Sequence, residues 1–223
     1  MFSIITSIIN DNEVTVNMMI VVFAITIIYA SVAERVSTHI TLLVLQGIVL
    51  FGIAVIELKH INFANLAFIL SETLIFKALV IPYYLRRIVI RNKISKTVDT
   101  IIPMYYTLII VSVAVVVFYI FAYSLNDTHL QIKYFTVSIS AIFAGILLIM
   151  THRGIIGHMI GYLVIENGIF LLSLAIGSEM PMIVNTAILM DILVSVLILG
   201  VFVNRIGSEF STLQITKLSE LKD

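Results

Sequence analysis

The chain has 223 residues, of which 61% are hydrophobic and only 12% are charged, with a formal net charge of zero and a mean hydropathy of +1.15. Soluble domains carry about twice that share of charged residues, so the composition excludes a soluble globular protein and predicts an integral membrane protein. The basic residues form no patch suited to nucleic acid. Without cysteine there is no iron–sulfur cluster, thiolate-bound nickel–iron centre, disulfide or classical zinc site. We therefore expect no cofactor and no catalytic centre.

Apolar runs of membrane-spanning length repeat along the chain, separated by short polar breaks. Each span needs ~20 residues, and backbone groups in lipid must bond internally, so we predict an all-α protein with about seven transmembrane helices. Segment 1–14 is too short to span, and Asp11 and Glu13 stand where a signal peptide is basic, so we expect no cleavage. The predicted helices cover 16–33, 39–56, 64–85, 101–124, 134–151, 155–176 and 183–204.

The basic residues between these helices alternate between the two sides of the membrane. By the positive-inside rule, this pattern predicts an outside N-terminus and a cytoplasmic C-terminus in a multi-pass protein of the cell membrane. The breaks that we expect in the cytoplasm contain Arg35, Arg86, Arg87, Arg91, Lys93, Lys96, Arg153 and Arg205.

We expect a single membrane domain over residues 1–223. The polar stretch 86–100 divides it into a three-helix half, 1–100, and a four-helix half, 101–223. In the cytoplasmic tail, apolar residues between 210 and 221 recur at helical spacing, which is typical of a short amphipathic helix. A frayed terminus is the alternative.

Four ionisable residues fall inside the predicted spans: Glu72, Lys77, Glu166 and Asp191. Each costs roughly 2.5 to 3.5 kcal/mol to place at the centre of a spanning helix, so each requires a functional or structural reason. The helical rise puts the three carboxyls at a common depth, ~20 Å from the arginines that end their helices. Burial favours their neutral form and a nearby cation favours the charged one, which suits a proton relay. Static ion pairs between helices are the alternative.

Lys77 is the expected counter-charge of this layer. Five residues at 100° each put Glu72 and Lys77 about 140° apart on one α-helix, so they should not pair well. We therefore expect the partner of Lys77 on another helix or in water.

Smaller polar groups in the 155–176 helix could support the acids. Gly157, Gly161 and Gly168 share one face and include a small-xxx-small packing motif, while Glu166 points away from them, so we expect protein on both sides of this helix. Asn167 either bonds a neighbour or fills a polar gap. His158 lies two turns before Glu166, where it could pass protons or serve a solvated or packing role.

The histidines fall in breaks or in the first turn of a helix, where we expect mostly interfacial positions and no metal site. They are His39, His60, His129, His152 and His158.

A weak internal repeat also supports the two halves. Glu72 and Arg86 match Asp191 and Arg205 at one offset, and Gln46-Gly47-Ile48 matches Asn167-Gly168-Ile169 at a similar one.

The C-terminal spans resemble a known family. The stretches R-G-I-I-G-H-M-I-G-Y-L-V-I-E-N-G and M-D-I-L-V-S-V-L-I-L-G-V-F-V-N-R, together with F-K-A-L-V-I-P around Lys77, resemble the E component of hydrogenase-4. The helices at 155–204 also resemble the second and third helices of subunit K of respiratory complex I, with matches at Arg153, Gly161, Asn167 and Asp191. The complex I glutamate aligns with Leu163, and Glu166 lies one turn later.

The resemblance implies a non-catalytic membrane subunit of a group 4 hydrogenase or complex I-like assembly. Its partners would be antiporter-like subunits and the subunit that anchors the redox arm, within the lipid bilayer. Glu166, Asp191, Lys77 and Glu72 would then help to move protons or sodium ions. A purely structural membrane subunit and a stand-alone transporter are the alternatives.

Overall fold

The computed structural model describes residues 2–57, 67, 69–91, 100–125 and 131–175. These residues form an all-α bundle, and five of the helices are long and apolar enough to cross a membrane, as in a multi-pass membrane protein. The elements are α1 (Phe2–Ala30), α2 (Val36–Glu57), the π-helix η2 (Glu72–Val80), α4 (Ile81–Arg91), α5 (Met104–Ser124), α6 (Ile132–Thr151) and α7 (Ile155–Ala175).

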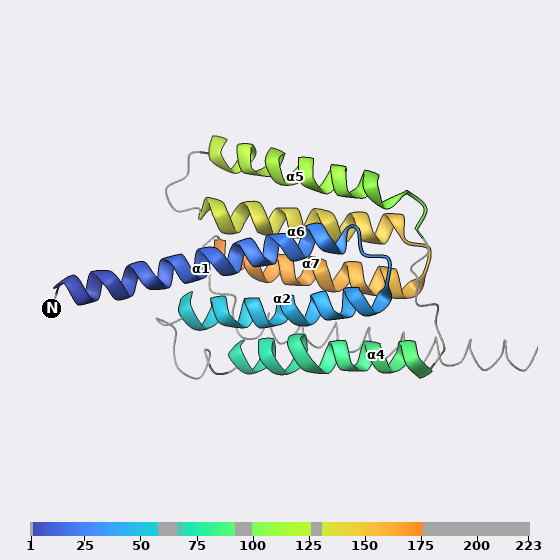
Figure 1. The fold of residues 1–223 in the computed structure, drawn as a ribbon, viewed down its shortest axis with the longest axis horizontal. Helices are drawn as coiled ribbons and strands as arrows, with labels where there is room; N and C mark the ends of the chain where they lie inside the picture. Colours follow the sequence, from blue (N-terminus) through green and yellow to red (C-terminus); the bar gives the residue numbers. More distant parts are fainter. Residues whose placement is uncertain (1, 58–66, 68, 92–99, 126–130, 176–223) are drawn as a thin grey trace, which may run out of the picture.

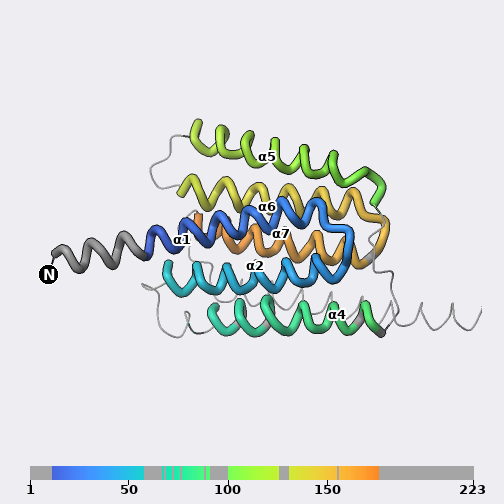
Figure 2. Tube along the Cα trace, viewed as in Figure 1, coloured from blue at the N-terminus to red at the C-terminus, as the bar shows by residue number. Residues whose placement is uncertain are grey.

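The helices run nearly side by side (Figure 1). Helix α7 packs against α6 and α2, while α1 packs against α2 and α6. Helix α5 lies at one edge of the bundle next to α6, and α4 lies at the opposite edge next to α2 (Figures 1 and 2). The two predicted halves of the chain therefore share contacts in one bundle.

Two predicted boundaries were wrong in detail. The predicted first span, 16–33, ends three residues too late, because α1 ends at Ala30, and it begins too late, because α1 already contains most of segment 1–14. The predicted third span, 64–85, contains η2, and the α4 that follows directly continues to Arg91, beyond the predicted end. The predicted seventh span, 183–204, and the amphipathic tail lie outside the described residues.

The change of helix type occurs immediately before Pro82. Proline has no backbone N–H and cannot donate to the carbonyl four residues earlier, so the α-helical bonding pattern is interrupted there. In η2 the bonds join residues five apart, and regular α-helix resumes at Ile81.

Helices α6 and α7 approach closely along small residues. A Cβ atom added to Gly161 would lie 2.7 Å from the Gly145 carbonyl oxygen, and one added to Gly145 would lie 2.6 Å from the Gly161 carbonyl oxygen. Gly168 faces Ala141 in the same way, with a hypothetical Cβ contact of 3.0 Å. The predicted packing face of α7 is confirmed, and its partner is α6.

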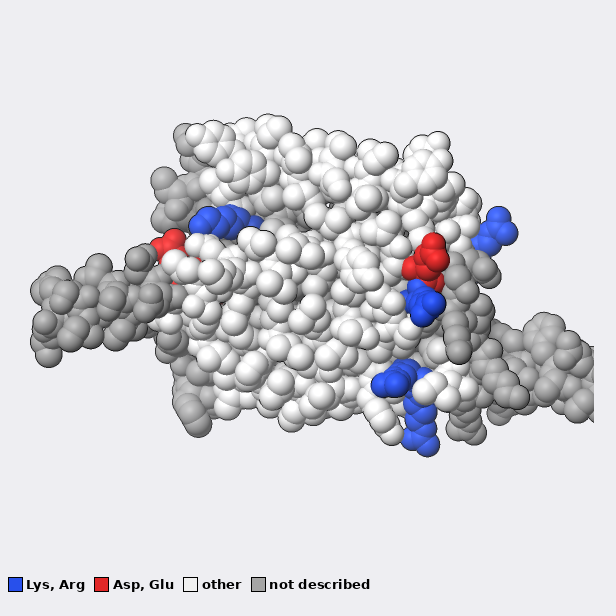
Figure 3. Space-filling view, viewed as in Figure 1, with Lys and Arg blue, Asp and Glu red and all other residues white. Residues whose placement is uncertain are grey.

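Charged side chains gather near the two ends of the bundle on the face shown in Figure 3, and the broad middle of that face is uncharged. We call one end the arginine end, where Arg35 follows α1, Arg153 precedes α7, and Arg86 and Arg87 occupy α4. This distribution fits a bilayer around the uncharged middle.

Candidate functional site: a buried ion pair within the bundle

The site centres on an ion pair between the Lys77 ammonium of η2 and the Glu166 carboxylate of α7. Both side chains are almost fully buried, with 6% and 8% of their surface exposed. The Lys77 ammonium also lies 4.6 Å from the centre of the Phe170 ring, one turn after Glu166, which gives a cation–π contact. The partner of Lys77 thus lies on another helix, one of the two alternatives that the sequence left open.

Apolar side chains enclose this pair. Leu43 of α2, Ile81 and Pro82 of α4, and Leu163 of α7 line a small cavity beside Lys77, Glu166 and Asn167. Two buried apolar clusters flank this level of the bundle. The pair therefore lies where water is scarce, and a buried charge there is costly unless it is paired.

A chain of buried polar side chains extends from the ion pair across two more helices. Asn167 Nδ2, next to Glu166, donates to Gln46 Oε1 of α2 at 3.0 Å. Gln46 Nε2 donates to Thr26 Oγ1 of α1 at 3.1 Å, and the Thr26 hydroxyl donates to the Phe23 carbonyl at 2.6 Å. Gln46 is fully buried. Glu166 and Asn167 thus bind α7 to η2 and α2, and Gln46 connects α2 to α1.

The remaining predicted site residues are only partly placed. Glu72 begins η2, a π-helix, in which the angle of about 140° between Glu72 and Lys77 that α-helical geometry predicts does not apply. Asp191 lies outside the described residues, and so does any contact between it and Glu166. The proposed layer of three carboxyls remains a prediction.

Two of the histidines are buried within the bundle, at the helix ends where the sequence places them. His39 and His152 have 1% and 5% exposure. Their rings meet edge to face with centroids 5.8 Å apart, and each ring bonds a backbone carbonyl, of Ala33 and Leu148 respectively. Tight helix packing at the arginine end explains the burial: a Cβ on Gly157 would lie 2.5 Å from His152 Cβ. His158 is exposed, which fits the solvated role that the sequence analysis allowed for it.

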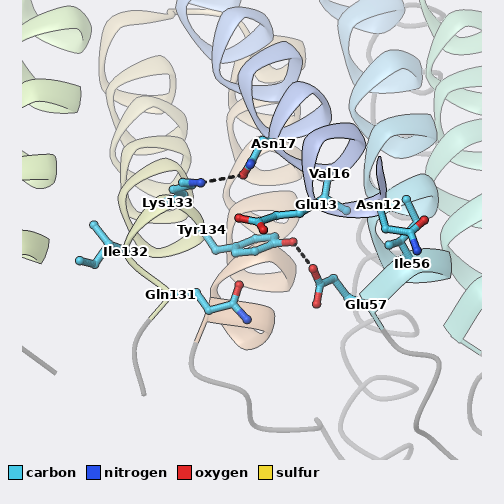
Figure 4. A pocket seen from close by; sticks show the side chains of 10 residues that line it. All are labelled: Asn12, Glu13, Val16, Asn17, Ile56, Glu57, Gln131, Ile132, Lys133 and Tyr134. Atoms are coloured by element: carbon cyan, nitrogen blue, oxygen red, sulfur yellow. Dashed lines mark hydrogen bonds between the residues drawn. The ribbon is translucent and has the colours of Figure 1, made fainter. Parts of the chain in front are cut away.

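A second polar group lies at the opposite end of the bundle, in a pocket of about 490 Å³ between α1, α2 and α6 (Figure 4). Tyr134 donates to Glu57 at 2.7 Å, and Lys133 donates to Asn17 at 3.0 Å. Glu13 also lines this pocket. These residues join the beginning of α6 to α1 and to the end of α2.

Sequence reasoning overlooked Gln46, Thr26 and Phe170 as parts of the site. One signal was present, because Gln46 is a polar residue inside an apolar span and aligns with Asn167 in the internal repeat. Thr26 and Phe170 carry no such signal, since threonine and phenylalanine are ordinary in spanning helices. Their roles depend on how the helices pack.

The chain was compared with protein-family models, with curated proteins and with solved structures, and none of these comparisons gave a match.

Proposed function

We propose that this chain is an ion-translocating membrane subunit of a hydrogenase-like or complex I-like redox-driven pump. The observation that carries the proposal is the buried ion pair of Lys77 and Glu166 in the interior of the helix bundle. Ionisable residues inside a membrane are expensive and commonly mark an ion pathway. The resemblance of the Lys77 and Glu166 segments to hydrogenase-4 and complex I subunits points to the same role.

The chemistry of the pair suits transfer of an ion. The Lys77 ammonium balances the charge of the buried Glu166 carboxylate, and if Lys77 moves away the site needs another positive charge. A charge displaced in a neighbouring subunit can therefore load or release a proton on Glu166. Sodium could replace the ammonium as the counter-ion of the carboxylate. Asp191 and Glu72 are proposed to continue the path.

The proposal includes a topology and a set of partners. About seven helices cross the cell membrane, with the N-terminus outside and the C-terminus and arginine end in the cytoplasm. Antiporter-like subunits and the subunit under the redox arm are the proposed neighbours. Electron transfer takes place in other subunits, and the present chain holds no cofactor.

The test is to measure electron transfer and ion pumping in the complex that co-purifies with the tagged chain. Glu166→Gln and Lys77→Met remove one charge each, and Glu34→Gln is the matched control because Glu34 is exposed. We expect both site variants to assemble, to keep electron transfer from soluble donors and to lose ion-gradient formation. The control should pump normally. Normal pumping by both site variants would disprove the proposal.

A structural subunit is the second candidate, and one observation favours it: the two charges neutralise each other within this chain. In that case pumping survives the substitutions as long as the complex assembles. A stand-alone transporter would instead be stable without partners and would carry ions in vesicles that contain only this chain.

A further inference from the structure

The hydrogen bonds from Asn167 to Phe23 have a fixed direction, which is set at the far end of the chain of side chains. The Phe23 carbonyl can only accept, so the Thr26 hydroxyl gives it its proton and must accept from Gln46 Nε2. Gln46 Oε1 is then the acceptor that faces Asn167, which must present its NH₂ group. Reversing either amide would set two acceptors against each other.

This direction leaves the Asn167 carbonyl oxygen, Oδ1, on the side away from Gln46. Asn167 is 4% exposed, and Oδ1 has no hydrogen-bond partner among the described residues. Buried polar atoms in native proteins are nearly always satisfied by protein or ordered water. Asn167 also lines the small cavity beside Lys77 and Glu166. An acceptor without a donor thus lies next to a charged pair and a space.

The size and chemistry of that space decide what fits it. Its volume of about 10 Å³ is at the lower bound for one water molecule, which needs two to four polar partners. Those partners are present: Asn167 Oδ1 and the Glu166 carboxylate accept, and the Lys77 ammonium donates. A metal cation would lie against the Lys77 ammonium, and a hard cation prefers a shell of several oxygen atoms. The Lys77 charge therefore favours water over a cation.

We infer that this cavity binds one water molecule, which donates to Asn167 Oδ1 and Glu166 and accepts from Lys77. The water joins the ion pair to the amide chain, so that α1, α2, η2 and α7 share one continuous polar network. The inference concerns binding and does not depend on pumping. The water would be present in a structural subunit as well, so failure of the proposed function and failure of this inference are distinguishable.

Crystals of the full chain grown in a lipid mesophase, at a resolution that orders internal water, provide the test. We expect a single density peak within hydrogen-bond distance of Asn167 Oδ1 and Lys77 Nζ. A soak with thallium(I), a monovalent cation with strong anomalous scattering, should give no anomalous signal there. The Asn167→Leu variant should lose the peak, and the Asn167→Asp variant, which keeps an oxygen acceptor, should retain it.

Three results would overturn the inference: an empty cavity in the native chain, an anomalous peak that identifies a cation site, or a side chain from elsewhere in the chain on Asn167 Oδ1. If Asn167→Leu does not fold, the native crystals and the thallium soak still decide.

Discussion

Asn167 of α7 donates a hydrogen bond to Gln46 of α2, a residue 121 positions earlier in the chain, and both side chains are buried. The two positions also align with each other in the weak internal repeat. Helices α2 and α7 run in the same direction and pack together (Figure 1). The aligned amides therefore meet across the contact between the two halves of the chain.

Removing the Gln46 side-chain amide should destabilise the bundle. Gln46→Leu leaves the Asn167 NH₂ group buried without an acceptor, and we expect a loss of about 1–3 kcal/mol in the free energy of unfolding. Thr41→Val is the matched control, because the Thr41 hydroxyl is exposed and donates to the Ser37 carbonyl of its own helix. Denaturation with SDS in mixed micelles measures both. If Gln46→Leu is as stable as the native protein, the hydrogen bonds of Gln46 to Asn167 and Thr26 contribute nothing to the free energy of unfolding.

Lys77 and Glu166 should be strongly coupled in a double-mutant cycle. Each single change, Lys77→Met or Glu166→Gln, leaves one buried charge without its partner, and we expect a loss of about 3–5 kcal/mol. The double variant should be more stable than the sum of the single losses predicts, because no charge remains to be buried. Micelle unfolding gives the four free energies. Additive losses would mean that the two charges do not interact.

An alanine substitution should destabilise the bundle only at a glycine where two helices are in close contact. Gly161→Ala places a methyl group against the Gly145 carbonyl oxygen, so α6 and α7 must move apart to make room for it. We expect a loss of about 1–3 kcal/mol from overpacking. Gly154→Ala is the control, since nothing lies within 4 Å of its added Cβ. If the Gly161 variant melts at the native temperature, the helices do not approach as closely as described.

The protein should lose stability in acid because His152 is buried at the arginine end. Burial lowers the pKa of the His152 imidazole, the bond to the Leu148 carbonyl opposes that shift, and His158 lowers the pKa further. Since the folded pKa lies below the ordinary value of about 6.5, the unfolded chain binds more protons, and stability should fall as the pH drops below that value. His158→Gln should move the pKa of His152 upward. NMR titration of labelled histidine measures this, and titration of His152 at or above its ordinary pKa would contradict it.

The proposed orientation can be tested with single cysteines, because the native chain contains none. Glu13→Cys lies at the end opposite the arginines and Arg153→Cys at the arginine end, and both native side chains are exposed. In intact cells, a membrane-impermeant maleimide should label only the Glu13 variant; in inverted vesicles it should label only the Arg153 variant. The reverse labelling pattern would show that the chain has the opposite orientation in the membrane.

The sequence by itself determined the class of the protein and most of its helices. Composition and hydropathy require a helical membrane protein, because apolar runs of this length can satisfy their backbone groups in lipid only as helices. The spacing of Gly161 and Gly168 also predicted the packing face of α7. These properties depend on residues close together in the chain, so local periodicity is enough to reveal them.

Only the tertiary structure decided which side chains meet. Lys77 pairs with Glu166, and Gln46 meets Asn167, because helices distant in sequence pack at a particular rotation and height. Lys77 also lies in the π-helix η2, which the α-helical spacing of the sequence did not predict. Burial of His39 and His152 likewise follows from the packing of helix ends. Such contacts depend on the rotation of whole helices, which apolar sequence specifies weakly because all faces of a buried helix are alike in hydropathy.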